Sequence, residues 1–182
     1  MMTEAQKRSL LELARAAIAS RFGGEAPHLP TDAAFQEKRG LFVTITLDGE
    51  LRGCIGMMKS EKSIAAEVVE MAREAAFGDP RFPALRRDEL PRLQIEISIL
   101  SPLFPVENLS EIQIGRDGLM LRKGFRSGVF LPQVPVEYDW DLDTYLSQLC
   151  LKAGLPNGAW KSPDAHLFRF EALVFSEADI LA

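Results

Sequence analysis

The chain has 182 residues, a formal net charge of −5, 47% hydrophobic and 26% charged residues. These values fit one globular domain whose core needs neither a disulfide nor a metal, and they disfavour a general binder of nucleic-acid backbones. Only two cysteines are present, residues 1–21 lack a secretory apolar core, and no apolar run reaches the roughly 20 residues of a membrane span. We therefore expect a cytoplasmic protein with reduced thiols and no membrane association.

Apolar periodicity and turn residues predict helices that alternate with β-hairpins. In chain order the expected elements are a helix from a capping box of Thr3 and Gln6 to Gly23-Gly24, a hairpin over residues 40–57 with its turn at Asp48-Gly49, a helix over about 62–77, a strand over 93–100, a hairpin with its turn at Asp117-Gly118, a strand over 129–131, a helix over about 142–152 and a last strand over about 167–175.

The register of the first hairpin decides which residues surround Cys54, because a one-residue slip turns every side chain to the other face. A two-residue turn would place Arg52 and Cys54 among Val43 and Ile45. A three-residue turn, with Gly49 as a bulge residue, separates polar from apolar side chains better, and we expect this register. One face then carries Thr44, Thr46, Glu50, Arg52 and Cys54, and the other carries Leu41, Val43, Ile45, Leu51 and Ile55.

The order of these elements predicts the fold class. Hairpins dominate, and only the second helix lies between strands as a crossover does, so we expect an α+β fold with helices packed on a mainly antiparallel sheet. No internal repeat, low-complexity tract or inter-domain linker is present. We expect a single domain over residues 1–182, with a larger lobe and a smaller β-rich lobe at about 101–136.

The segment Leu51–Gly56 (Leu-Arg-Gly-Cys-Ile-Gly) carries the strongest candidate chemistry. Arg52 and Cys54 lie two residues apart, hence on one face of a strand, and a guanidinium beside a thiol favours the reactive thiolate. Gly53 and Gly56 indicate a bulge or the close approach of a backbone or a ligand. The plain alternatives are a strand cysteine that only packs and an arginine in a surface ion pair.

A nucleophilic cysteine needs a general base. Glu96 is the best-placed candidate if the strand over 93–100 neighbours the hairpin, although a glutamate on the solvated face of a sheet is equally expected there. His28 and His166 are the only histidines, and nothing in their spacing links either one to Cys54.

A rigid turn, Gly78–Pro83, carries Asp79 and Arg81. It either offers Arg81 to an anionic group or ends the second helix with an internal ion pair. Gln133, beside two prolines, is a further candidate for contact with a polar ligand group. The sequence contains no dinucleotide fingerprint, P-loop, nucleophile elbow or zinc-ligand spacing, so it indicates no cofactor and no metal.

These segments together resemble a known family. Residues 51–56 match the signature hexapeptide of the AMMECR-one domain family, which is named after the AMME syndrome critical region gene one protein. Further matches follow in the family's order, and together they span nearly the whole chain: Phe42–Thr44, Asp79–Phe82, Glu96–Leu100, Gly115–Leu119, Leu131–Val134, Trp140 and Cys150–Leu155.

The resemblance implies a two-lobed α+β fold with the hexapeptide near a cleft, and it leaves the biochemical activity open. Prokaryotic members are associated with Memo-like and radical-SAM proteins, which implies partners of these two kinds in a shared pathway. The family's recurrent positions correspond here to Arg52, Gly53, Cys54, Gly56, Asp79, Arg81, Glu96 and Gln133.

Three functions are compatible with these residues. The first, which we favour, is an enzyme in which Cys54 is the nucleophile or redox thiol, Arg52 stabilises the thiolate and Glu96 is the base. Its small or modified substrate group would be bound by Gly53, Gly56, Asp79, Arg81 and Gln133. The second is a binding or accessory module whose groove holds a protein partner or a modified nucleotide, with Cys54 only packing. A nucleic-acid-associated protein with a local basic patch is a third, which the net charge disfavours.

Overall fold

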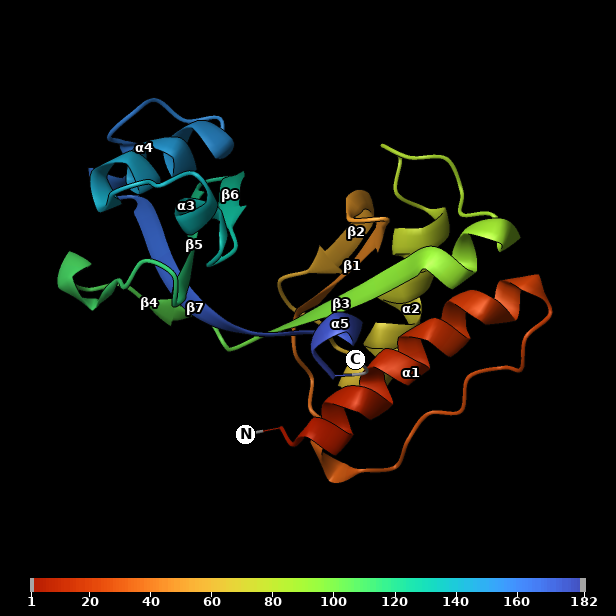
Figure 1. Cartoon of the computed structure of the whole chain (residues 1–182). Coiled ribbons are helices and arrows are strands. Elements are labelled where there is room, and N and C mark those ends of the chain that lie inside the picture. The colour runs from red at the N-terminus through yellow and green to blue at the C-terminus, as the bar shows by residue number, and fades with distance from the viewer. Residues whose placement is uncertain (1, 181–182) are drawn as a thin grey trace. The chain divides into compact units, whose positions relative to one another are not determined.

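The computed structural model describes residues 2–180 (Figure 1). The chain divides into two compact units. Unit 1 comprises the chain up to Leu100 and again from Leu173, and unit 2 comprises Ser101–Ala172. Unit 2 begins where the sequence predicts the smaller lobe, but it extends far beyond residue 136, because the third long helix and most of the last strand pack into its core.

Unit 1 combines an antiparallel sheet with two long helices (Figure 1). Its elements are α1 (Glu4–Ala19), η1 (Ser20–Phe22), η2 (Ala33–Phe35), β1 (Leu41–Leu47), β2 (Glu50–Met57), α2 (Ile64–Phe77), η3 (Arg87–Arg92), β3 (Leu93–Leu100) and α5 (Glu177–Ile180). Strand β1 lies between β2 and β3. The predicted capping box of Thr3 and Gln6 is confirmed, as is the predicted strand over 93–100.

One face of this sheet forms the core of unit 1. Val43 and Ile45 of β1 and Ile97 of β3 are fully buried, and they pack in one cluster with the apolar stripes of α1 and α2. Thr44 and Glu96, which alternate with these residues, are half-buried on the opposite face. Strand periodicity therefore separates a helix-covered core face from a second face that carries polar side chains.

The β1–β2 hairpin follows neither register considered from the sequence. Its turn has two residues, Asp48 at φ 52° and Gly49 at φ 86°, which are the positive angles of a type I′ turn. Leu51 pairs with Thr46 and is exposed, so its expected place on the core face is wrong.

A β-bulge then returns the remaining residues of β2 to the faces expected from the sequence. The register shifts by one after Thr46, so that Gly53 lies opposite Ile45 and Cys54 opposite Thr44, and Arg52 is the extra residue. The expectation that Cys54 and Thr44 share a face is therefore confirmed, although a bulge at Arg52 produces it rather than a three-residue turn.

Gly53 is required by the close approach of a helix. A Cβ atom at this position would overlap the carbonyl oxygen of Ala75 in α2. The space beside Gly53 is thus filled by protein backbone, and the role that the structure assigns to this glycine is packing. Gly56 is similar, since a Cβ there would overlap the ring of Phe42.

We expect Gly53→Ala to lower the free energy of unfolding by about 2–3 kcal/mol, because an overpacked methyl group here meets helix backbone that cannot rotate away. Urea denaturation followed by circular dichroism measures the change. Glu50→Ala, at an exposed position on the same strand, is the control and should leave the midpoint unchanged. Equal midpoints for the two variants would contradict the packing role.

Unit 2 packs one long helix against antiparallel strands (Figure 1). Its elements are β4 (Phe104–Pro105), η4 (Leu109–Glu111), β5 (Asp117–Lys123), β6 (Arg126–Phe130), α3 (Val134–Glu137), α4 (Leu142–Lys152), η5 (Ala159–Lys161) and β7 (Ala165–Ser176), whose residues up to Ala172 belong to this unit. Strand β5 pairs with β6 and β7, and β4 pairs with β7. The observed elements confirm the predicted α+β class.

The predicted hairpin turn at Asp117-Gly118 is wrong. Asp117 begins β5 with a fully buried side chain, and the hairpin turns instead at Gly124-Phe125, with Gly124 at φ 59°. An Asp-Gly pair is typical of a turn when the carboxylate is solvated. Here ion pairs hold the carboxylate inside the unit instead.

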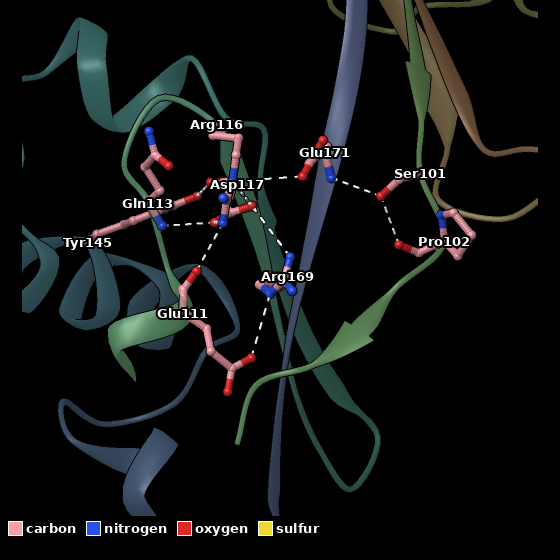
Figure 2. A network of polar contacts seen from close by, with 9 residues as sticks. All are labelled: Ser101, Pro102, Glu111, Gln113, Arg116, Asp117, Tyr145, Arg169 and Glu171. Atoms are coloured by element: carbon pink, nitrogen blue, oxygen red, sulfur yellow. Dashed lines mark hydrogen bonds and ion pairs between the residues drawn. The ribbon is translucent and has the colours of Figure 1, made fainter. Parts of the chain in front are cut away.

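Figure 2 shows the network around the buried Asp117 carboxylate. Arg116 donates to both carboxylate oxygens, at 3.0 and 2.6 Å, and the backbone N–H of Gln113 donates at 2.8 Å. Arg169 of β7 forms a longer ion pair at 3.9 Å. The Tyr145 hydroxyl donates to the Asp117 carbonyl oxygen at 3.3 Å, and burial raises the pKa of Tyr145. The network ties the segment before β5 to β7 and α4, which makes it a structural element of unit 2.

Candidate functional site

A row of three polar side chains crosses the sheet of unit 1. Thr44 of β1 lies opposite Cys54 of β2 on one side and opposite Glu96 of β3 on the other. The Thr44 hydroxyl Oγ1 lies 3.2 Å from the Cys54 sulfur and donates a hydrogen bond to it. Directly opposed residues have Cβ atoms about 5 Å apart, so the Thr44 side chain lies between those of Cys54 and Glu96. The row lies on the face opposite the helices, and all three residues are half-buried.

The backbone direction at Cys54 explains this close contact. Strand β2 is at the edge of its sheet in unit 1, and the N–H and C=O of Cys54 point outward, away from β1. Thr44 and Cys54 are therefore a non-hydrogen-bonded pair, the kind in which opposed side chains come closest.

Asp79 and Arg81 bind the outward-pointing backbone of Cys54. The Asp79 carboxylate accepts the Cys54 N–H at 3.0 Å, and an Nη atom of Arg81 donates to the Cys54 carbonyl at 3.3 Å. Arg81 also makes two hydrogen bonds to Asp79, at 3.0 and 2.8 Å. The two side chains thus cover the open edge of β2 at the cysteine, where an unpaired strand would otherwise expose its peptide groups.

The electrostatics of this pair follow from burial on one side and exposure on the other. The bonds from Arg81, together with those from the backbone N–H groups of Cys54 and Arg81, hold the pKa of the buried Asp79 carboxyl well below its usual range. The Arg81 side chain remains 55% exposed, and its guanidinium lies over the Phe82 ring at 5.4 Å. A buried aspartate therefore fixes an arginine whose outer edge stays accessible beside Cys54. The internal ion pair predicted as one reading of this turn is present.

Arg52 is directed elsewhere, which corrects its expected place beside the thiol. Its guanidinium makes two hydrogen bonds to Glu89, both at 3.1 Å, and donates to the Pro83 carbonyl at 2.7 Å. Side-chain exposure is only 11% for Arg52 and 7% for Glu89. Burial acts to raise the pKa of Glu89, but the bonds from Arg52 and the Arg86 N–H outweigh it and lower that pKa. The physical reason is the bulge, which takes Arg52 out of the alternation that holds Cys54 and Thr44 together.

The remaining candidate residues belong to other elements of the chain. Gln133 belongs to unit 2, where it immediately precedes α3 and is half-buried. His28 is exposed in the loop after η1, and His166 is exposed on β7 in unit 2. Over residues 2–180, no group of three or more His, Cys, Asp or Glu side chains has the arrangement of a metal site. None of the helices in that range is long and apolar enough to cross a membrane.

Two contributors to the site were not identified as site residues from the sequence. Thr44 was placed on the face of Cys54, but a threonine in an alternating strand carries no signal of its own. Glu89 lies 37 positions after Arg52, and its only local signal is its place in the first turn of η3. Both depend on which strands and loops meet in the folded chain.

An α+β protein with a cysteine-bearing edge strand is the class that this geometry defines. The AMMECR1 family model matches residues 11–175, so the chain belongs to the AMMECR1 family, the AMMECR-one domain family that the hexapeptide resembles. It is 45% identical to Protein MK0488 of Methanopyrus kandleri over 93% of this chain and 87% of that protein, and 46% identical to Protein MJ0810 of Methanocaldococcus jannaschii over 80% and 76%. The crystal structure of the uncharacterized protein PH0010 from Pyrococcus horikoshii is similar, with a TM-score of 0.83, 36% identity and coverage of 95% of this chain and 92% of that one.

Proposed function

We propose that this protein is a cysteine-dependent enzyme in which the Cys54 sulfur is the nucleophile. The observation that carries the proposal is the Thr44–Cys54 hydrogen bond of 3.2 Å within a row that continues to Glu96. A hydroxyl can both donate and accept a proton, so Thr44 can pass the thiol proton towards a carboxylate. Glu96 then acts as the base and Thr44 as the group that connects it to the thiol.

The proposed step moves one proton along this row. The Thr44 hydroxyl, which donates to the sulfur at rest, first turns its proton towards Glu96. As the sulfur forms a bond to an electrophilic carbon or to another sulfur, the thiol proton passes to the Thr44 oxygen, and the Thr44 hydroxyl proton passes to the Glu96 carboxylate. The substrate's leaving group departs with the electron pair of the bond that breaks. Gly56, next but one along β2, lets the Phe42 ring lie close to the strand beside this row.

The position of Arg81 indicates that the substrate carries an anionic group. Its bonds to Asp79 and to the Cys54 carbonyl hold the guanidinium next to residue 54, while more than half of its side chain stays exposed. A fixed guanidinium with an accessible edge recognises a carboxylate or a phosphate. We therefore assign Arg81 to substrate binding, and Asp79 to positioning Arg81 and the cysteine backbone.

Thiol labelling tests both assignments. The measured quantity is the rate of labelling by the anionic reagent iodoacetate divided by the rate of labelling by neutral iodoacetamide. We expect this ratio to be about fivefold higher for Cys54 than for a small free thiol, because one positive charge a few ångströms away attracts the anion by about 1 kcal/mol. Arg81→Gln should abolish this preference. Arg86→Gln, at an exposed arginine paired with Asp88, is the control and should keep it. Cys150 is fully buried, and a Cys150→Ser background removes its contribution.

The two assignments fail in different ways. If neither reagent labels Cys54 in the folded protein, the nucleophile is contradicted. If both reagents label it with the ratio of a free thiol, only the anionic substrate is contradicted. Thr44→Val should slow both reagents alike, since it removes the hydroxyl that contacts the sulfur and leaves Arg81 in place.

A second function, a non-catalytic binding module, is supported by a different observation. Three residues of the hexapeptide have packing roles: Gly53 against α2, Gly56 against Phe42 and Arg52 against Glu89. In that case the Memo-like and radical-SAM proteins are candidate partners. Cys54→Ser in a host that lacks its own copy separates the functions, because an enzyme loses its activity and a binding module keeps it.

A further inference from the structure

Unit 2 carries an exposed aromatic stack that its core does not use. The Tyr138 ring lies on Trp140 with centroids 5.2 Å apart and an interplanar angle of 20°, and Tyr138 is 66% exposed. Trp140 packs edge-on against Phe130 at 5.3 Å, and Phe130 contacts the fully buried Tyr145. The four rings form a ladder from the core of unit 2 to an outermost ring that solvent reaches.

The C-terminal cap of α3 fixes the outer two rings in this arrangement. Asp139, between them, has φ 51°, the left-handed conformation that commonly ends a helix and that aspartate tolerates better than most non-glycine residues. The N–H of Trp140 donates to the Pro135 carbonyl at 2.8 Å, and the N–H of Asp139 donates to the Val136 carbonyl at 3.2 Å. These bonds fix the backbone beneath the stack, so the exposed Tyr138 ring is held in place on Trp140.

Negative charge surrounds this stack. Alternate positions of the segment 137–143 are the exposed acids Glu137, Asp139, Asp141 and Asp143. Within residues 2–180 none of these four carboxylates forms an ion pair, and no lysine or arginine occurs between residues 134 and 143. Asp141 also caps α4 through the Thr144 N–H. Negatively charged side chains therefore predominate around the two outer rings.

We propose that residues 137–143, the aromatic–acidic patch, bind an arginine-containing basic segment of a partner protein. A guanidinium stacks flat on an exposed aromatic ring and bonds carboxylates in pairs, so one arginine side chain satisfies both features of the patch. The ladder already accepts one cation, because the Lys152 ammonium lies 5.5 Å from the centre of the Phe130 ring. Charge complementarity thus selects a basic partner, and the stacked rings select arginine over lysine.

Fluorescence anisotropy with the full-length protein tests this. The probes are three labelled peptides of equal length in which arginine, lysine or glutamate alternates with glycine. We expect the arginine peptide to bind at low salt, the lysine peptide several-fold more weakly and the glutamate peptide not at all. Tyr138→Ala should weaken arginine-peptide binding about fivefold, the effect of one cation–π contact. Asp139→Asn, which keeps the backbone conformation accessible, should weaken it and reduce its salt dependence.

Phe125→Ala is the matched control. Phe125 is a fully exposed aromatic residue of unit 2, at the turn of the β5–β6 hairpin. The Phe125→Ala variant should bind the arginine peptide as tightly as the unchanged protein does. The proposal is overturned if the arginine and lysine peptides bind equally, if Tyr138→Ala and Phe125→Ala have equal effects, or if no arginine peptide binds at low salt.

Discussion

Replacing Arg52 by methionine is expected to lower the free energy of unfolding by about 3–5 kcal/mol, because it leaves the Glu89 carboxylate buried without its partner. The pair is almost fully enclosed, and Arg52 also bonds the Pro83 carbonyl, so the loop after α2 loses an anchor as well. Urea denaturation measures the loss as a lower midpoint at an unchanged slope.

Two further variants give this prediction its control. Arg86→Met breaks the exposed pair with Asp88 in the same region of the chain and should leave the midpoint unchanged. Arg52→Met combined with Glu89→Leu removes both buried charges and should recover most of the lost stability. If Arg52→Met alone is as stable as Arg86→Met, the anchoring role of Arg52 is falsified. The sequence-based expectation that Arg52 lies beside the thiol would then stand again.

Asp79→Asn is expected to lower the free energy of unfolding by about 2–3 kcal/mol at pH 7, since the amide cannot accept hydrogen bonds from all four donors that converge on the carboxylate. In either orientation its nitrogen faces an N–H of the Arg81 guanidinium, donor against donor, together with the backbone N–H of Cys54 or of Arg81. Thermal unfolding of the variant and of the unchanged protein measures the difference. Asp88→Asn, at an exposed carboxylate, is the control.

The stability difference between the unchanged protein and Asp79→Asn should depend on pH with a definite sign. The pKa of Asp79 is lower in the folded protein than the value of about 3.9 expected when unfolded. A lowered pKa contributes stability that is fully present above pH 4 and is lost as the pH falls towards the folded-state pKa. The difference between the two proteins should therefore be constant from pH 8 to about 5 and shrink below about 4. A difference that grows on acidification would contradict the proposed network.

Local signals in the sequence account for most of the element boundaries. The helix over 142–152 and the strand over 93–100 were predicted with the bounds observed, because caps and apolar periodicity act over a few neighbouring residues. The Asp117-Gly118 turn failed because an ion-pair network with Arg116 and Arg169 outweighs the local turn preference.

The candidate site was predictable only in part, because contacts between distant parts of the chain decide it as well. The sequence brought out Cys54, Asp79, Arg81 and Glu96 as chemically able residues, and the sheet places Cys54 and Glu96 on either side of Thr44. It placed Arg52 beside the thiol, whereas the bulge and Glu89 direct that guanidinium to a structural ion pair. Gln133 belongs to the other compact unit.

By itself the sequence determined the family, the α+β class and the presence of a thiol between two glycines on a strand, since each of these depends on residue type and short-range spacing. Only the tertiary structure decided which arginine meets the cysteine. That choice depends on a one-residue bulge and on contacts across 25–37 positions of chain, such as Asp79 with Cys54 and Glu89 with Arg52. Charged side chains pair with whichever opposite charge the packed backbone brings within reach, and no local pattern in the chain encodes that distance.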